Sequence, residues 1–144
     1  MSLAEAVRAA RGTRDWQRLV QALPFANFLQ LRIDVRGELL TCVLPAQERL
    51  VGNRTLPALH GGATAGFMDC AAILFLLWRT DAVTLPKAID FNIDFLRSAK
   101  VQETFAEMHL VKLGARVANV RVLAWQTEPE KPIAIGHGNF LLAP

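Results

Sequence analysis

The chain has 144 residues, a length typical of one domain. Hydrophobic residues make up 52% of the sequence, which is enough for a sizeable core. The formal net charge is only +3, and the arginines and lysines are scattered rather than grouped, so a nucleic-acid-binding surface is not indicated. Such scattered cations suit a small anionic ligand better.

Two cysteines, Cys42 and Cys70, lie in apolar segments, and their spacing is not that of a metal site. We interpret both as reduced thiols in the core of a cytosolic protein. The first residues lack the apolar core of a signal peptide. The apolar run over residues 71–78 is too short to span a bilayer. We therefore expect a soluble, cytoplasmic protein without a membrane partner.

Hydrophobic spacing predicts a helical N-terminal segment over residues 3–22, interrupted at Gly12-Thr13 and ended by Pro24. Alternating residues predict a strand over 29–35, and a turn at 36–38 leads to a return strand over 39–44. Residues 45–59 contain Gly and Pro at turn positions, and we expect a loop there. Residues 61–79 are apolar on nearly every face, which predicts one long buried helix.

After a connector at 80–87, alternation predicts four more strands, over residues 89–96, 104–113, 116–126 and 133–142. Two strands, one buried helix and four strands fit an α+β fold in which an antiparallel sheet of about six strands wraps around the helix. Because the helix is apolar all round, either the sheet curls around it or a second subunit covers it.

The segment with most chemistry has His60-Gly61-Gly62 at the predicted start of the long helix and Asp69 inside it. The first N–H groups of a helix lack intrahelical partners and favour anions. A carboxylate in an apolar helix is costly unless a site uses it. The pattern therefore indicates oxyanion stabilisation beside a base. The structural alternatives are a tight turn at the glycines and a buried, hydrogen-bonded acid at Asp69.

These motifs, together with residues 50–62, 88–97, 111–118 and 132–142, resemble the hot-dog fold acyl-CoA thioesterases of the phenylacetate-degradation type, related to 4-hydroxybenzoyl-CoA thioesterases. The resemblance covers residues 24–143. It implies a single hot-dog domain over residues 1–144, with residues 1–23 as a helical extension. It also implies hydrolysis of an acyl-CoA thioester without a metal or redox cofactor.

By position, the resemblance implies that the backbone N–H of Gly61, with Gly62, polarises the thioester carbonyl. It gives Asp69 the role of general base or of nucleophile. Gly61 and Asp69 are eight residues apart, which is about 12 Å along one helix. Both cannot contact one carbonyl, so either the helix starts later or Gly61 of one subunit works with Asp69 of another. We therefore expect a homodimer with two shared sites and antiparallel helices, or a pair of such dimers.

Two positions depart from the pattern of the family. Asn53 lies seven residues before His60, where the family often has Asn six before its His, and Asn53 is either a site residue or a turn residue. Ala88 stands where relatives can carry Ser or Thr. For His60 we favour a role in fixing the loop over direct catalysis, because a helix N-terminus disfavours a cation.

Four cations are candidates for binding the phosphates of CoA, the alternative being a solvated strand edge. They are Arg97, Lys100, Lys112 and Arg116. Two other functions stay open at this point. One is a non-catalytic acyl-CoA-binding hot-dog protein, which the departures at Asn53 and Ala88 keep in view. The other is a hot-dog dehydratase or hydratase, whose His and acid spacing is not matched here.

Overall fold

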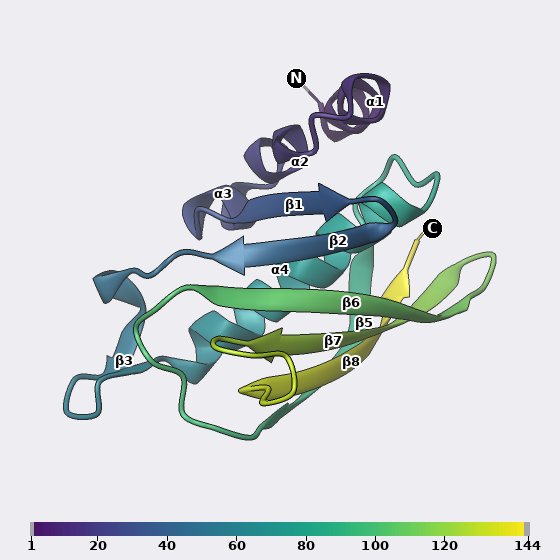
Figure 1. Ribbon diagram of the computed structural model, residues 1–144. Helices are drawn as coiled ribbons and strands as arrows, with labels where there is room; N and C mark the ends of the chain where they lie inside the picture. The colour runs from purple at the N-terminus through teal and green to yellow at the C-terminus, as the bar shows by residue number, and fades with distance from the viewer. Residues whose placement is uncertain (1, 143–144) are drawn as a thin grey trace.

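In the computed structural model, which describes residues 2–142, six antiparallel strands form one sheet that wraps around a single long helix, α4 (Gly61–Arg79) (Figure 1). The strand order across the sheet is β1-β2-β6-β7-β8-β5. The strands are β1 (Arg32–Arg36), β2 (Leu39–Leu44), β5 (Lys87–Phe95), β6 (Thr104–Leu113), β7 (Val117–Trp125) and β8 (Ala134–Leu141). The predicted α+β hot-dog architecture is confirmed.

The inner face of the sheet is built from alternate residues that pack on α4. Along β8, Gly136, Gly138 and Phe140 are buried, whereas His137 between them is exposed. A Cβ atom at Gly136 would lie 3.1 Å from Cε of Met68 on α4, so the small residue lets the helix approach the sheet closely. Strand alternation therefore places the core between the sheet and α4.

Helix α4 begins and ends where the sequence predicted, and ten of its side chains are buried. By length and composition alone, this 19-residue helix could cross a membrane, which the shorter run at residues 71–78 did not indicate. The core helix of a sheet-wrapped domain has the same composition, and 56% of its most apolar window is buried inside the protein. Burial against the sheet accounts for its hydrophobicity.

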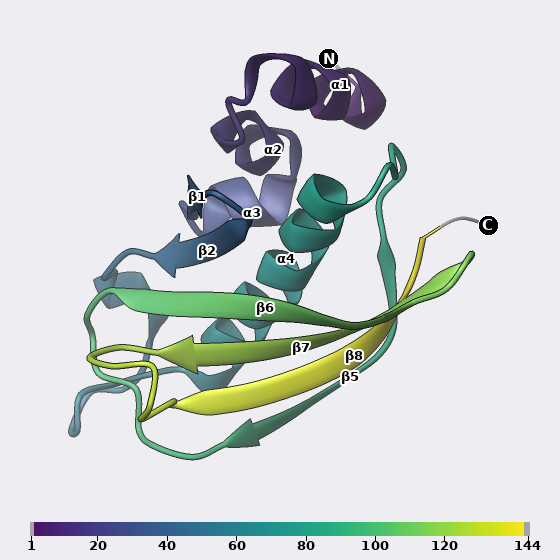
Figure 2. The same ribbon diagram turned by 45° about the vertical axis from the view of Figure 1, so that its right-hand side comes forward.

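The N-terminal segment forms three helices, α1 (Leu3–Thr13), α2 (Gln17–Ala22) and α3 (Pro24–Phe28), which lie over β1 and α4 (Figure 2). Pro24 ends the second helix as predicted, but it also begins α3, since proline is well suited to the first turn of a helix. The strand predicted from residue 29 instead begins at Arg32. Gln30, with a φ of 58°, separates α3 from this strand.

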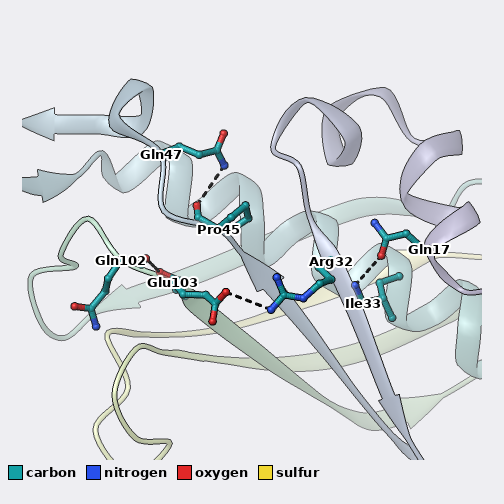
Figure 3. A network of polar contacts seen from close by, with 8 residues as sticks. Gln17, Arg32, Ile33, Pro45, Gln47, Gln102 and Glu103 are labelled. Atoms are coloured by element: carbon teal, nitrogen blue, oxygen red, sulfur yellow. Dashed lines mark hydrogen bonds and ion pairs between the residues drawn. The ribbon is translucent and has the colours of Figure 1, made fainter.

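Polar contacts tie these helices to the rest of the domain. The Gln17 amide donates to the Leu31 carbonyl at 2.8 Å. The amide oxygen of Gln17 accepts the Ile33 N–H at 3.1 Å (Figure 3). This amide thus satisfies backbone groups at the edge of β1. The Arg11 guanidinium donates to the carbonyls of Leu77, Thr80 and Ala82, which closes the C-terminal end of α4.

The segment predicted as a loop over 45–59 contains more regular structure than expected. It forms a 3₁₀ turn, η1 (Glu48–Leu50), and a small ribbon of β3 (Val51–Asn53) with β4 (Ala58–Leu59). The Leu59 N–H donates to the Ala99 carbonyl at 2.9 Å and the His60 N–H to the Leu50 carbonyl at 2.8 Å. These long-range bonds, which sequence periodicity does not report, fix the approach of the chain to α4.

Candidate active site

His60 is the N-cap of α4, and its imidazole organises the first turn of the helix. Nδ1 of His60 accepts the Gly62 N–H at 2.8 Å. Nδ1 can accept this bond only through its unprotonated lone pair. This geometry agrees with the loop-fixing role expected for His60. Because the Gly62 N–H already donates to the imidazole, it is not free to bind an oxyanion.

Gly61, the first residue of α4, keeps its backbone N–H free. Within residues 2–142, no acceptor lies within hydrogen-bond geometry of this N–H. This N–H lies at the positive end of the dipole of a 19-residue helix, which favours a negatively charged ligand at the helix N-terminus. Of the two glycines in the motif, Gly61 is therefore the one with a donor available for an oxyanion.

A hollow of about 390 Å³ opens directly at Gly61. It is lined by Thr64 of α4, by Phe95 at the end of β5, and by the following residues Leu96, Arg97 and Ser98. Sequence reasoning missed Thr64, although its spacing of three residues from Gly61 puts both on one helix face. It also missed Phe95 and Ser98, because only the bend of the chain after β5 brings them here.

Asp69 lies in the third turn of α4, on a partly exposed face of an otherwise buried helix. In the described part of the chain, its Oδ1 is the one buried side-chain oxygen or nitrogen without a hydrogen-bond partner. Burial raises the pKa of this carboxyl above its ordinary value. An unpartnered buried carboxylate oxygen is costly, which argues against a purely structural acid.

Gly61 and Asp69 belong to one uninterrupted helix, so the option of a later helix start is wrong. Their separation of eight residues corresponds to a rise of about 12 Å. A base or nucleophile must come within about 3 Å of the reacting atoms. A single protomer therefore does not bring the two groups to one carbonyl.

Asn53 lies at the end of β3, where its side chain forms a turn. Its Oδ1 accepts the backbone N–H groups of Thr55 at 2.9 Å and Leu56 at 3.3 Å. The side chain is exposed, and its oxygen is engaged in an Asx-type turn. The structure thus gives Asn53 a local bonding role that is independent of any ligand.

The four candidate CoA-binding cations divide between two ends of the protomer. Arg97 lines the hollow at Gly61 and donates to the Pro132 carbonyl at 2.7 Å, and Lys100 is exposed three residues later. Lys112 and Arg116 line a second hollow of about 370 Å³ at the β6–β7 hairpin. That hairpin lies at the opposite end of the sheet from the start of α4 (Figure 2).

Residues 2–142 contain no cluster of three His, Cys, Asp or Glu side chains placed to hold a metal ion. Asp90 is exposed, and its carboxylate accepts hydrogen bonds from the backbone and side chain of Asn139 across β5 and β8. Asn139 in turn accepts from Asn119 at 2.9 Å. These polar side chains of β5, β8 and β7 therefore bond to one another across neighbouring strands.

Residues 56–133, more than half of the chain, match the sequence profile of the Thioesterase superfamily. The chain belongs to this superfamily. The matched range contains both the free N–H of Gly61 and the carboxylate of Asp69. No curated protein matches the chain.

Solved structures of the same fold span nearly the whole chain. A Chromobacterium violaceum protein is 34% identical, with a TM-score of 0.77 and coverage of 96% of this chain and 97% of that one. A Shewanella oneidensis protein related to the thioesterase superfamily is 24% identical, with a TM-score of 0.75 and coverage of 98% and 97%. A Ralstonia eutropha phenylacetic acid degradation-related protein, described as a candidate thioesterase, is 17% identical, with a TM-score of 0.74 and coverage of 88% and 98%. The last two similarities establish the shared fold alone.

Proposed function

We propose that this member of the Thioesterase superfamily hydrolyses an acyl-CoA thioester to the free acid and CoA. The observation that carries the proposal is the buried Oδ1 of Asp69, which has no partner within residues 2–142 and lies in the core helix of the fold. A protein that only bound acyl-CoA would gain nothing from such a group, because an unsatisfied buried carboxylate oxygen lowers stability.

The free N–H of Gly61 supplies the second requirement of thioester hydrolysis. Attack on the thioester carbon places negative charge on the carbonyl oxygen, and a preorganised N–H at a helix N-terminus stabilises that charge. His60 contributes indirectly, because its bond to Gly62 keeps the first turn of α4 in one conformation. The N–H of Gly61 can therefore stabilise the negative charge on the carbonyl oxygen without a change in the helix start.

Asp69 then activates water or attacks the carbonyl itself. As a general base, its carboxylate takes a proton from water while the water oxygen bonds to the thioester carbon. As a nucleophile, it forms an anhydride that water opens in a second step. In both routes the carbon–sulfur bond breaks, and CoA leaves as a thiolate that takes up a proton. Burial raises the pKa of Asp69, which makes its carboxylate a stronger base.

We further propose that the site is shared by two subunits whose α4 helices lie side by side and antiparallel. The rise of about 12 Å along α4 between Gly61 and Asp69 supports a second copy, because one protomer does not bring both groups to one carbonyl. Strand β5 supports this arrangement, because it ends the sheet and exposes Ile89 and Phe95, at 58% and 57%. An open, apolar strand edge is a natural place for a second copy to pair.

We propose that Arg97 contacts the CoA phosphates, since it is the one candidate cation that lines the hollow at Gly61. Its bond to the Pro132 carbonyl holds the guanidinium in place while its other N–H groups stay available. We also propose that the protein is a thioesterase of the phenylacetate-degradation type. This proposal rests on the sequence resemblance and on the fold shared with the Ralstonia eutropha protein.

The purified protein can be tested with a panel of acyl-CoA thioesters and a thiol-reactive dye. We expect wild type to release CoA and Asp69→Ala to release it at least 100-fold more slowly, because general-base contributions are about 10²–10⁴-fold. Thermal stabilisation by acyl-CoA without release of CoA would instead identify a binding protein. Full activity of Asp69→Ala would contradict the proposed mechanism.

A further inference from the structure

Helix α3 presents two phenylalanines at the surface of the protein. Phe25 and Phe28 are 50% and 53% exposed, and their rings stack with centroids 6.0 Å apart and planes 14° apart. A single exposed phenylalanine is ordinary. Two stacked rings on one five-residue helix form an ordered apolar surface, which we call the α3 shelf.

The α3 shelf touches α4 one turn before Asp69. A Cβ atom at Gly66 would lie 2.8 Å from Cε2 and 3.1 Å from Cζ of Phe25, so the ring occupies the space that a side chain at this position would fill. Gly66 and Asp69 are three residues apart and therefore share one helix face. Because helical side chains lean toward the N-terminus, Asp69 leans over the turn that contains Gly66.

Arg49 and Gln47 hold the α3 shelf in place. The Arg49 guanidinium lies 4.4 Å from the centre of the Phe28 ring and also donates to the Phe28 carbonyl. Nε of Arg49 donates to Gln47 at 2.8 Å, and the Gln47 amide donates to the Leu29 carbonyl at 2.9 Å. A ring pair that is already ordered loses little conformational entropy when a ligand packs on it.

We propose that Phe25 is a specificity-determining residue of the Asp69 half-site, with its ring as the surface on which a flat apolar acyl group packs. The inference rests on the proposed function, since hydrolysis places the acyl group beside Asp69. Phe28 stacks on the Phe25 ring, and Arg49 contacts Phe28. Stacking of one ring on another adds a preference over an aliphatic chain of about two- to tenfold.

Binding of two thioethers tests this inference without hydrolysis. S-phenethyl-CoA and S-octyl-CoA carry the same number of carbon atoms on sulfur, and neither can be cleaved as a thioester. We expect wild type to favour S-phenethyl-CoA, and Phe25→Ala to shift the ratio of the two Kd values toward S-octyl-CoA by about two- to tenfold. Gly66→Ala keeps the aromatic ring but displaces it, and should shift the ratio in the same direction.

Phe105→Ala is the matched control, because Phe105 also belongs to a stacked pair, with Trp125, on the outer face of the sheet. This variant should leave the ratio unchanged. An unchanged ratio in Phe25→Ala and Gly66→Ala would overturn the inference, and loss of the oligomer in Phe25→Ala with an unchanged ratio would identify a subunit contact instead. If the protein binds S-phenethyl-CoA selectively but hydrolyses no acyl-CoA, the proposed hydrolysis is wrong. The inferred role of Phe25 in selecting the ligand would then still stand.

Discussion

The backbone N–H of Gly61 and the carboxylate of Asp69 lie on one uninterrupted helix, eight residues and therefore about 12 Å apart along its axis. Each lacks a hydrogen-bond partner within residues 2–142, at the N–H of the first and at Oδ1 of the second. We propose that these two groups carry out thioester hydrolysis, yet one protomer holds them too far apart to act on one carbonyl.

Replacing Gly61 by proline removes its N–H and keeps the start of the helix. Proline is favoured at the first helical position, and His60, with a φ of −64° and a ψ of 133°, has the extended conformation that a residue before proline adopts. We expect kcat to fall about 10²–10³-fold, the usual cost of losing one oxyanion donor, with little change in Tm.

Gly61→Ala is the control for this variant, because it retains the N–H. Its Cβ would make ordinary contact with the Phe95 ring at 3.6 Å. Steady-state kinetics of both variants give the comparison. Equal losses in Gly61→Pro and Gly61→Ala would mean that the shape of the site, and not the N–H, is what matters at this position.

Asp69→Asn should inactivate the protein and stabilise it at neutral pH. Burial raises the pKa of Asp69, so the folded protein holds this proton to higher pH than the unfolded chain does. Between the two pKa values the folded state binds more protons, and the free energy of unfolding contributed by this group falls as pH rises through that window. Urea unfolding of wild type and variant should show an advantage for Asp69→Asn at neutral pH that shrinks in acid.

The same shift predicts the pH dependence of catalysis. Both roles proposed for Asp69 require its carboxylate form, so kcat/KM should decline as pH falls through a pKa above the ordinary aspartate value. The free enzyme's pH profile, measured with one acyl-CoA, reports this pKa. An acid limb at the ordinary aspartate pKa would show that Asp69 is solvated in the working protein.

His60 should matter for the helix start more than for proton transfer. His60→Ala removes the acceptor for the Gly62 N–H, and loss of an N-cap costs about 1 kcal/mol of the free energy of unfolding. His60→Ser restores an acceptor at the N-cap and should recover most of that stability and activity. Thermal unfolding and kinetics of the pair decide the matter, and an inactive but stable His60→Ser would assign the ring a catalytic role.

Arg11 should stabilise the domain from outside the site. Its guanidinium donates to four carbonyls in and just after the last turn of α4, and Arg11→Ala should lower the free energy of unfolding by about 2 kcal/mol. Arg8→Ala, an exposed position on the same helix, is the matched control and should be nearly neutral. Equal effects of the two variants in urea unfolding would show that the cap does not act in solution.

The sequence predicted the parts of this fold that depend on local periodicity. The bounds of α4, the hairpin of β1 and β2 and the last four strands follow from apolar spacing, and so does the placement of Gly61 at the helix start. Helix α3 was missed because a five-residue helix is too short to show a period, and Pro24 was interpreted only as a helix end. The β3–β4 ribbon was missed because its strands have three and two residues.

The site was predictable in composition but not in its bonding. Sequence spacing singled out Gly61 and Asp69 as candidates and predicted that they lie eight residues apart on one helix. It did not show that His60 takes up the Gly62 N–H, that Asn53 bonds within its own turn, or that Lys112 lies far from Arg97. These depend on side-chain rotamers and on contacts between segments distant in the chain, which no local pattern encodes.

Hybrid dimers test whether Gly61 of one subunit and Asp69 of its partner form each site, as we propose. We expect homodimers of Gly61→Pro and homodimers of Asp69→Ala to be nearly inactive, but a hybrid dimer contains one site with both groups intact. After unfolding and refolding of an equal mixture, about half of the dimers are hybrids with one working site of two, so we expect about a quarter of wild-type activity. Activity that stays at the level of the separate variants, in a mixture shown to contain hybrid dimers, would contradict the shared site.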